Sequence, residues 1–134
     1  SNLDVVFLLD MSCSIEFSGA GNWNRLLRFV SEIVESDRYE VNPDNTRFAA
    51  ITYSNDAEVV FYLNSYDSAA STSAALQAIQ YEAGETNIAA ALELARTEIF
   101  QVFLLLFYVI FSGNPLVFLR RAQAIDLQAT IWLY

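Results

Sequence analysis

An unbroken apolar run occupies residues 5–9, with Asp4 before it and Asp10 and a serine-rich turn after it. A strand with one face in water alternates apolar and polar residues, whereas a strand covered on both faces is apolar throughout. The valine and phenylalanine residues of this run also favour a strand. We therefore expect residues 4–10 to form a strand of a parallel sheet that is covered by helices on both faces.

The rest of the chain alternates between helix-like and strand-like segments. Residues 22–36 have apolar residues at helical spacing, and a tight connection at residues 54–56 predicts a hairpin. Such alternation predicts an α/β fold with a Rossmann-like, mostly parallel central sheet, helices on both faces and one antiparallel edge strand from the hairpin. The expected strands are residues 4–10, 46–53, 57–63, 102–111 and 129–134, and the expected helices are residues 22–36, 68–80, 87–100 and 113–127.

The composition excludes several classes of function. The chain has no His and no Lys. It therefore lacks the Ser-His and Cys-His pairs of common hydrolases, an imidazole metal ligand and a phosphate-binding lysine. Its formal charge is −9, which argues against nucleic acid as a partner. The longest apolar run, residues 102–111, has about half the length of a membrane span, so we expect no membrane insertion. Cys13 is the single cysteine and cannot form an internal disulfide.

Three loops with oxygen-bearing side chains are expected at one edge of the sheet, because the carboxyl ends of parallel strands meet there. They are residues 10–14, 84–87 and 112–113. In the first loop Asp10, Ser12 and Ser14 alternate, so a carboxylate and two hydroxyls can point to the same side of a turn. Hard divalent cations prefer such oxygen ligands.

These segments resemble the von Willebrand factor type A domains, which are adhesion modules of integrins and matrix proteins. The resemblance covers about residues 3–134, and its three motifs have the order and separation that the family shows. The motifs are DVVFLLDMSCSI at residues 4–15, RFAAITYS at residues 47–54 and GETNIAAAL at residues 84–92. A complete domain of this family adds a helix, a strand and a last helix, so residues 1–134 resemble a single domain without that final helix-strand-helix.

The resemblance implies a metal-ion-dependent adhesion site (MIDAS) for Mg²⁺, or for Mn²⁺ or Ca²⁺. Its ligands would be Asp10, Ser12, Ser14 and Thr86, with Ser112 as a weak ligand where the family usually has the aspartate of a Thr-Asp-Gly motif. One of the family's two carboxylates is therefore absent, and Glu16 or Glu85 is a candidate to replace it. We also expect Glu85 and Asn87 to contact a partner.

The function that the resemblance implies is a non-enzymatic adhesion or extracellular-matrix module, secreted or part of an ectodomain. It would engage an acidic side chain of a matrix or cell-surface protein through the cation. Its oligomeric state is not determined by the sequence.

Three alternatives remain open. The first is that Asp10, Ser12, Ser14 and Thr86 only cap helices. The second is a metal-independent structural domain that acts through its acidic surface, because residues 1–100 hold 15 acidic residues and 5 arginines. The third is a phosphohydrolase with Asp10 as nucleophile, although such enzymes use a second aspartate at the position of Ser12 and a lysine that the chain lacks.

Overall fold

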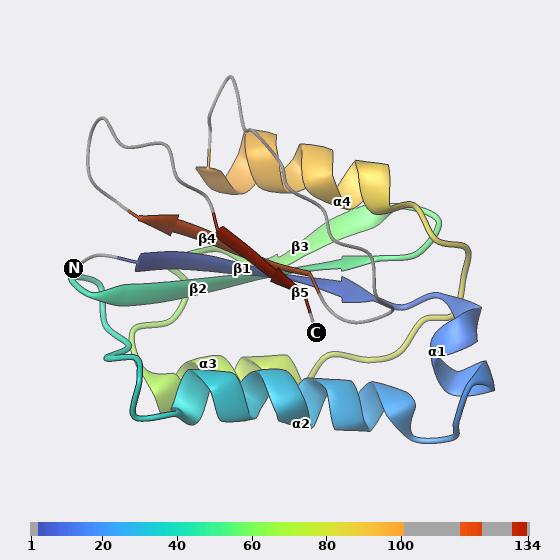
Figure 1. Ribbon diagram of the computed structural model, residues 1–134, viewed down its shortest axis with the longest axis horizontal. Helices are drawn as coiled ribbons and strands as arrows, with labels where there is room; N and C mark the ends of the chain where they lie inside the picture. Colours follow the sequence, from blue (N-terminus) through green and yellow to red (C-terminus); the bar gives the residue numbers. More distant parts are fainter. Residues whose placement is uncertain (1–2, 101–115, 122–129, 134) are drawn as a thin grey trace.

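The computed structural model describes residues 3–100, 116–121 and 130–133. A twisted sheet lies between two layers of helices, with α2 and α3 on one face and α4 on the other (Figure 1). The strands occur in the order β3-β2-β1-β4-β5 across the sheet. The strands are β1 (Leu3–Asp10), β2 (Thr46–Tyr53), β3 (Ala57–Phe61), β4 (Leu116–Arg121) and β5 (Thr130–Leu133), and the helices are α1 (Cys13–Phe17), α2 (Asn22–Glu35), α3 (Ala69–Gln77) and α4 (Ile88–Leu94), which continues as a π-helical segment, Ala95–Phe100.

Strand β1 pairs with β2 in parallel over its full length, from Leu3 opposite Thr46 to Asp10 opposite Tyr53. Both strands are apolar and buried along most of their length, as the unbroken apolar runs predict. Strand β3 returns antiparallel to β2 and forms an edge of the sheet. The expected strand at residues 4–10 and the expected hairpin are therefore confirmed.

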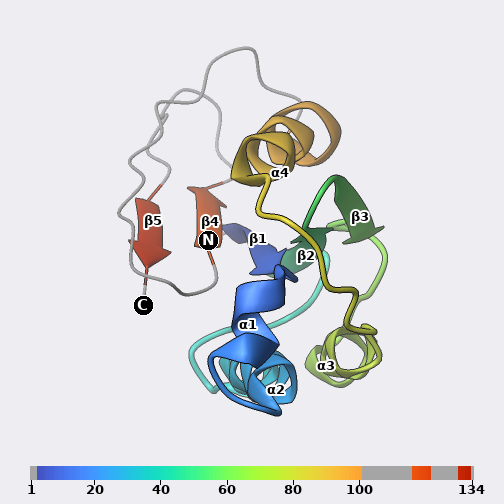
Figure 2. The ribbon, with the colours of Figure 1, turned by 90° about the vertical axis from the view of Figure 1, so that its right-hand side faces the viewer.

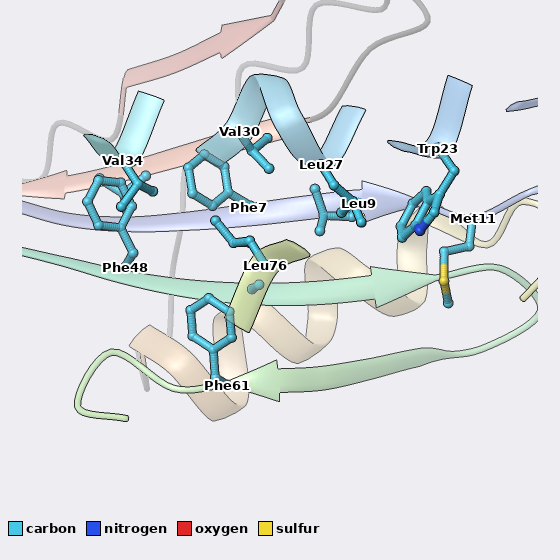
Figure 3. Close-up of a cluster of buried hydrophobic side chains, with 12 residues drawn as sticks. Phe7, Leu9, Met11, Trp23, Leu27, Val30, Val34, Phe48, Phe61 and Leu76 are labelled. Atoms are coloured by element: carbon cyan, nitrogen blue, oxygen red, sulfur yellow. The ribbon is translucent and has the colours of Figure 1, made fainter. Parts of the chain in front are cut away.

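The two faces of the sheet have separate hydrophobic cores. Phe7 and Leu9 of β1 pack towards α2 and α3, where Phe7 stacks on Phe48 with a centroid distance of 5.5 Å (Figure 3). Val6 and Leu8, which alternate with them, pack towards α4. Each buried side chain of this size contributes about 1.5–3 kcal/mol to folding. This burial on both faces holds β1 in place, and with it the position of its carboxyl end.

The start of β1 contains a partly buried ion pair. Asp4 is 4% exposed and lies beside Arg47 of β2 in the parallel register. The Arg47 guanidinium donates from Nε and Nη2 to the two oxygens of Asp4, both at 2.8 Å. This bidentate hydrogen bond raises the pKa of Arg47 above its ordinary value. The negative charge of Asp4 is thus paired inside the fold.

Two expectations about the C-terminal part of the chain are corrected. The helix expected at residues 113–127 is wrong at Leu116–Arg121, which is strand β4 and runs antiparallel to β1. Because β5 is antiparallel to β4, the described strands form a mixed sheet with one parallel pairing, and not a mostly parallel sheet. The leucine, valine and phenylalanine of β4 favour a strand, which also pairs the second edge of β1.

Other elements differ from expectation mainly at their ends. The expected helices at residues 22–36, 68–80 and 87–100 are present with shorter bounds or, in the last case, a π-helical end. The strand expected at residues 129–134 is confirmed at Thr130–Leu133, and the one at residues 102–111 lies outside the described residues. Within residues 3–100, no helix is both long and apolar enough to cross a membrane.

Candidate functional site

The candidate site lies at the carboxyl end of β1, where the chain turns into α1. Figure 2 looks onto this end of the molecule, with α1 in front of the sheet. The Met11 N–H donates to the Tyr53 carbonyl at 2.8 Å, so the pairing of β1 with β2 continues one residue beyond the strand. The buried strand and this hydrogen bond hold the following turn in place.

The first loop brings three of the predicted oxygen groups together. The Ser12 N–H donates to Oδ1 of Asp10 at 2.7 Å, and Ser12 Oγ lies 2.9 Å from Ser14 Oγ. Ser12 precedes α1 as its N-cap residue, but its side chain makes no capping hydrogen bond. The interpretation of this turn as a mere helix cap therefore lacks the bond that would support it.

The geometry of this loop fits a hard divalent cation. Octahedral Mg²⁺ binds oxygen at about 2.0–2.1 Å, which places neighbouring ligands about 2.9 Å apart. The two serine hydroxyls, which form a hydrogen bond with each other, have this separation. Within residues 3–100, Oδ2 of Asp10 has no hydrogen-bond partner, and no group of three or more His, Cys, Asp or Glu side chains could hold a metal. The available donors are thus one carboxylate and hydroxyls, which suit magnesium better than a soft metal.

The second loop, residues 84–87, lies against the first. The Cys13 N–H donates to the Gly84 carbonyl at 2.9 Å. A Cβ atom at Gly84 would lie 2.8 Å from Ser54 Cβ and from Asn55 Oδ1, so glycine is required for this close approach. Thr86 is exposed two residues further on, and its hydroxyl makes no hydrogen bond within the described residues. Its role as a ligand stays a prediction.

Asn87, rather than Thr86, is the N-cap residue of α4. Its Oδ1 accepts from the Ala90 N–H at 3.1 Å, and its Nδ2 donates to the Asn55 carbonyl at 3.1 Å. Asn87 and Glu85 are both exposed, and their contact with a partner stays a prediction. The interpretation of Thr86 as a helix cap is wrong, because the cap position is one residue later.

Glu16 does not supply a second carboxylate to the site. Its two oxygens accept hydrogen bonds from the N–H groups of Trp23 at 2.7 Å and Gly21 at 2.8 Å, at the N-terminus of α2. These bonds lower the pKa of Glu16, and the positive charge of Arg25 adds a smaller effect. Glu16 therefore fixes α1 to α2. Ser112, the predicted weak ligand, lies outside the described residues.

Two tyrosines flank the first loop and are not apparent from its motif. The Tyr81 hydroxyl donates to the Ser12 carbonyl at 2.9 Å, and the Tyr81 ring lies 5.7 Å from that of Trp23. Burial raises the pKa of Tyr53 above its ordinary value, and the negative charge of Asp10 adds to the shift. Tyr81 thus holds the backbone of the loop, while Tyr53 lies in the electric field of its carboxylate.

The sequence of residues 4–103 matches the family model of the von Willebrand factor type A domain. Among individual proteins, the chain is 35% identical to the collagen alpha-5(VI) chain of Mus musculus over 91 residues, which cover 68% of the chain and 3% of that protein. It is 28% identical to vitrin of Mus musculus over 101 residues, which cover 75% of the chain and 15% of that protein.

A solved structure with a related sequence shows the same fold. Proximal thread matrix protein 1 of the mussel byssus, with a zinc-occupied MIDAS motif, aligns with a TM-score of 0.68 and 33% identity over 72% of the chain and 24% of the mussel chain. The chain therefore spans much less than two thirds of the length of these relatives.

Proposed function

The chain belongs to the von Willebrand factor type A domain family, and we propose that it is a non-enzymatic adhesion module that binds an acidic side chain of a protein partner through a divalent cation. The proposed ligands are Asp10, Ser12, Ser14 and Thr86, with Ser112 as a weaker one. The observation on which the proposal depends is the convergence of Asp10, Ser12 and Ser14 at the carboxyl end of β1.

Each residue of the first loop has a distinct task in this proposal. When bound, Mg²⁺ or Mn²⁺ supplies positive charge and a coordination position that a carboxylate from outside can fill. Asp10 provides the charged oxygen, and its other oxygen orients the loop through the Ser12 N–H. The hydroxyls of Ser12 and Ser14, 2.9 Å apart, provide neutral oxygens.

The small number of acids at the site favours an anionic partner. A divalent cation beside one carboxylate keeps a net positive charge, whereas two carboxylates would neutralise it. Water-excluded contact between that charge and a Glu or Asp of the partner would be strong, because the effective dielectric constant is low there. A single local positive charge would thus allow an acidic partner to approach a chain whose overall charge is −9.

The setting proposed for this contact is the extracellular matrix or a cell surface. Collagen VI chains, vitrin and the byssal matrix protein are extracellular matrix proteins. By analogy, we assign the chain to a secreted protein or an ectodomain and its partner to the matrix proteins. This assignment depends on the relatives and not on the geometry of the site.

Isothermal titration of Mn²⁺ and Mg²⁺ into the metal-free chain tests the proposal. We expect one cation site in the wild type and no measurable binding in Asp10→Ala, because the variant loses the one carboxylate of the donor set. Asp37→Ala, which removes an exposed acid just after α2, is the matched control and should bind as the wild type does. Absence of binding in the wild type, or equal binding in Asp10→Ala, contradicts the proposal.

The acidic surface supports a second candidate function. Residues 1–100 carry a net charge of −10, and this surface would bind a basic partner without a cation. Adhesion of the labelled chain to a cell-derived matrix separates the two functions. Loss of adhesion in EDTA supports the cation-dependent module, whereas adhesion that persists in EDTA and weakens steeply with salt supports the acidic surface.

A further inference from the structure

The backbone on both sides of Thr86 is tied to the turn between β2 and β3. The Glu85 N–H donates to Oδ1 of Asn55 at 2.7 Å. On the other side, the Asn87 N–H donates to the Ser54 carbonyl at 2.8 Å and Asn87 Nδ2 donates to the Asn55 carbonyl at 3.1 Å. Figure 1 shows the segment that leads into α4 passing this turn. Thr86 is therefore held by its neighbours and not by contacts of its own side chain.

The same turn is linked to the first loop of the candidate site. Tyr53, the last residue of β2, accepts a hydrogen bond from the Met11 N–H, and Gly84 accepts one from the Cys13 N–H. Asn55 follows Tyr53 by two residues, and its Oδ1 would lie 2.8 Å from a Cβ atom at Gly84. Asn55 thus contacts the second loop beside Gly84, the residue that accepts the hydrogen bond from the first loop.

We infer that Asn55 is a positioning residue for the cation site, which it serves by fixing the backbone that carries Thr86, in the loop that is hydrogen-bonded to Cys13. This inference rests on the proposed cation-binding function. Asn55 acts through the Glu85 N–H and does not itself contact the cation. A residue that orients a ligand loop without touching the metal affects metal affinity through that loop.

The positioning effect of Asn55 depends on its side-chain oxygen, which accepts the hydrogen bond from the Glu85 N–H. An acceptor at this position satisfies the Glu85 N–H, while the carbonyl of residue 55 bonds Asn87 whatever the side chain is. Asn55→Ala removes the acceptor but keeps the backbone carbonyl. Asn55→Asp keeps an acceptor oxygen on a side chain of the same length, so it should keep the hydrogen bond from the Glu85 N–H. The two variants therefore separate the acceptor from the simple presence of a turn.

The experiment compares four proteins: the wild type, Asn55→Ala, Asn55→Asp and the control Asn64→Ala, which alters an exposed turn residue after β3. Mn²⁺ affinity is measured by titration calorimetry, and hydrogen exchange of the Glu85 and Asn87 amides is measured in the metal-free chain. For Asn55→Ala we expect a roughly tenfold loss of Mn²⁺ affinity and a similar loss of protection at Glu85. Asn55→Asp should bind at least as tightly as the wild type, and Asn64→Ala should match the wild type.

The readouts distinguish this inference from a purely structural role and from the proposed function. Loss of thermal stability in Asn55→Ala with unchanged Mn²⁺ affinity, or failure of Asn55→Asp to restore affinity, overturns the inference. If the wild type binds no Mn²⁺, the proposed function fails. In that case the exchange data still decide whether Asn55 fixes the backbone around Thr86, and unchanged protection in Asn55→Ala would reject that as well.

Discussion

The two ends of β1 each have an aspartate, and the two aspartates have opposite surroundings. Asp4 is buried and receives two hydrogen bonds of 2.8 Å from Arg47. Asp10 is half-buried and receives one hydrogen bond, from the Ser12 N–H, within the described residues. One carboxylate is paired with an arginine, and the other lies beside the hydroxyls of Ser12 and Ser14 with no ion pair within the described residues.

The difference shows how one strand serves both stability and binding. A buried charge without a partner lowers the stability of the fold. Asp4 is tolerated because Arg47 lies opposite it in the register of β1 and β2. Asp10 lies at the edge of the sheet, where solvent and the loop can stabilise its charge. An acid that the fold does not neutralise is the one available to a cation, and we therefore place the candidate site at the Asp10 end.

The largest expected effect comes from Arg47→Met, which leaves Asp4 without its partner. Loss of one member of a buried ion pair costs about 3–5 kcal/mol. Because the Arg47 side chain is 34% exposed, solvent screens part of this cost, and we expect a loss of about 2 kcal/mol in the free energy of unfolding. Urea denaturation measures it, and Mn²⁺ affinity should stay unchanged because the pair lies at the opposite end of β1.

Two variants serve as controls for this effect. Arg28→Met removes an exposed arginine of α2 and should change stability by less than about 0.5 kcal/mol. Asp10→Asn in the metal-free chain should cost at most about 1 kcal/mol, because the asparagine oxygen still accepts from the Ser12 N–H. A loss in Asp10→Asn as large as that in Arg47→Met would contradict the distinction between the two ends.

A smaller effect is expected from Tyr81→Phe, which loosens the Asp10 end. The variant removes the hydroxyl that donates to the Ser12 carbonyl and keeps the ring beside Trp23. We expect a loss of about 1 kcal/mol in stability, with weaker Mn²⁺ binding, since the loop backbone loses one support. Tyr66→Phe is the matched control, because the Tyr66 ring packs on Phe61 as well. Equal behaviour of the two variants in denaturation and titration would reject the role of Tyr81.

The smallest effect concerns alkaline pH and the charge of Asp10. Since the pKa of Tyr53 is raised in the folded state, unfolded chains ionise this tyrosine first and stability falls as pH rises above about 10. We expect Tyr53→Phe to reduce this fall by less than about 1 kcal/mol at about pH 11. In Asp10→Asn, tyrosinate absorbance should show a lower pKa for Tyr53. An unchanged titration would contradict the proximity of the two groups.

Most of the fold of residues 3–100 could be predicted from periodicity. The apolar runs of β1 and β2 are a clear sequence signal because both faces of the sheet are covered. The amphipathic pattern of α2 is equally clear because one side of this helix packs on the sheet. The five residues of α1 are too few to show a period, and the sequence predicts a serine-rich turn there. The sequence predicts a helix at strand β4, because the four apolar residues before Arg120 and Arg121 fit either structure when their neighbours are unknown.

The candidate site could be predicted only in part. The alternation of Asp10, Ser12 and Ser14 predicts their convergence, since alternate residues of an extended turn share a side. The roles of Tyr81 and Asn55 depend on contacts with segments distant along the chain, and single tyrosine and asparagine residues give no pattern that would indicate them. Likewise, the sequence leaves Glu16 as a candidate for the site. Its bonds to the start of α2 depend on the direction of α1, which the sequence does not indicate.

The hydrogen bond between Tyr81 and Ser12 joins residues that are 69 positions apart, so it has a consequence for folding. Forming a contact of such long sequence separation requires the entropic cost of closing a long loop. The loop of Asp10 can be assembled completely only after β1, β2 and the segment before α4 have come together. A ligand that binds this loop would therefore select the fully folded chain over partly folded forms and would stabilise it in proportion to the logarithm of ligand concentration.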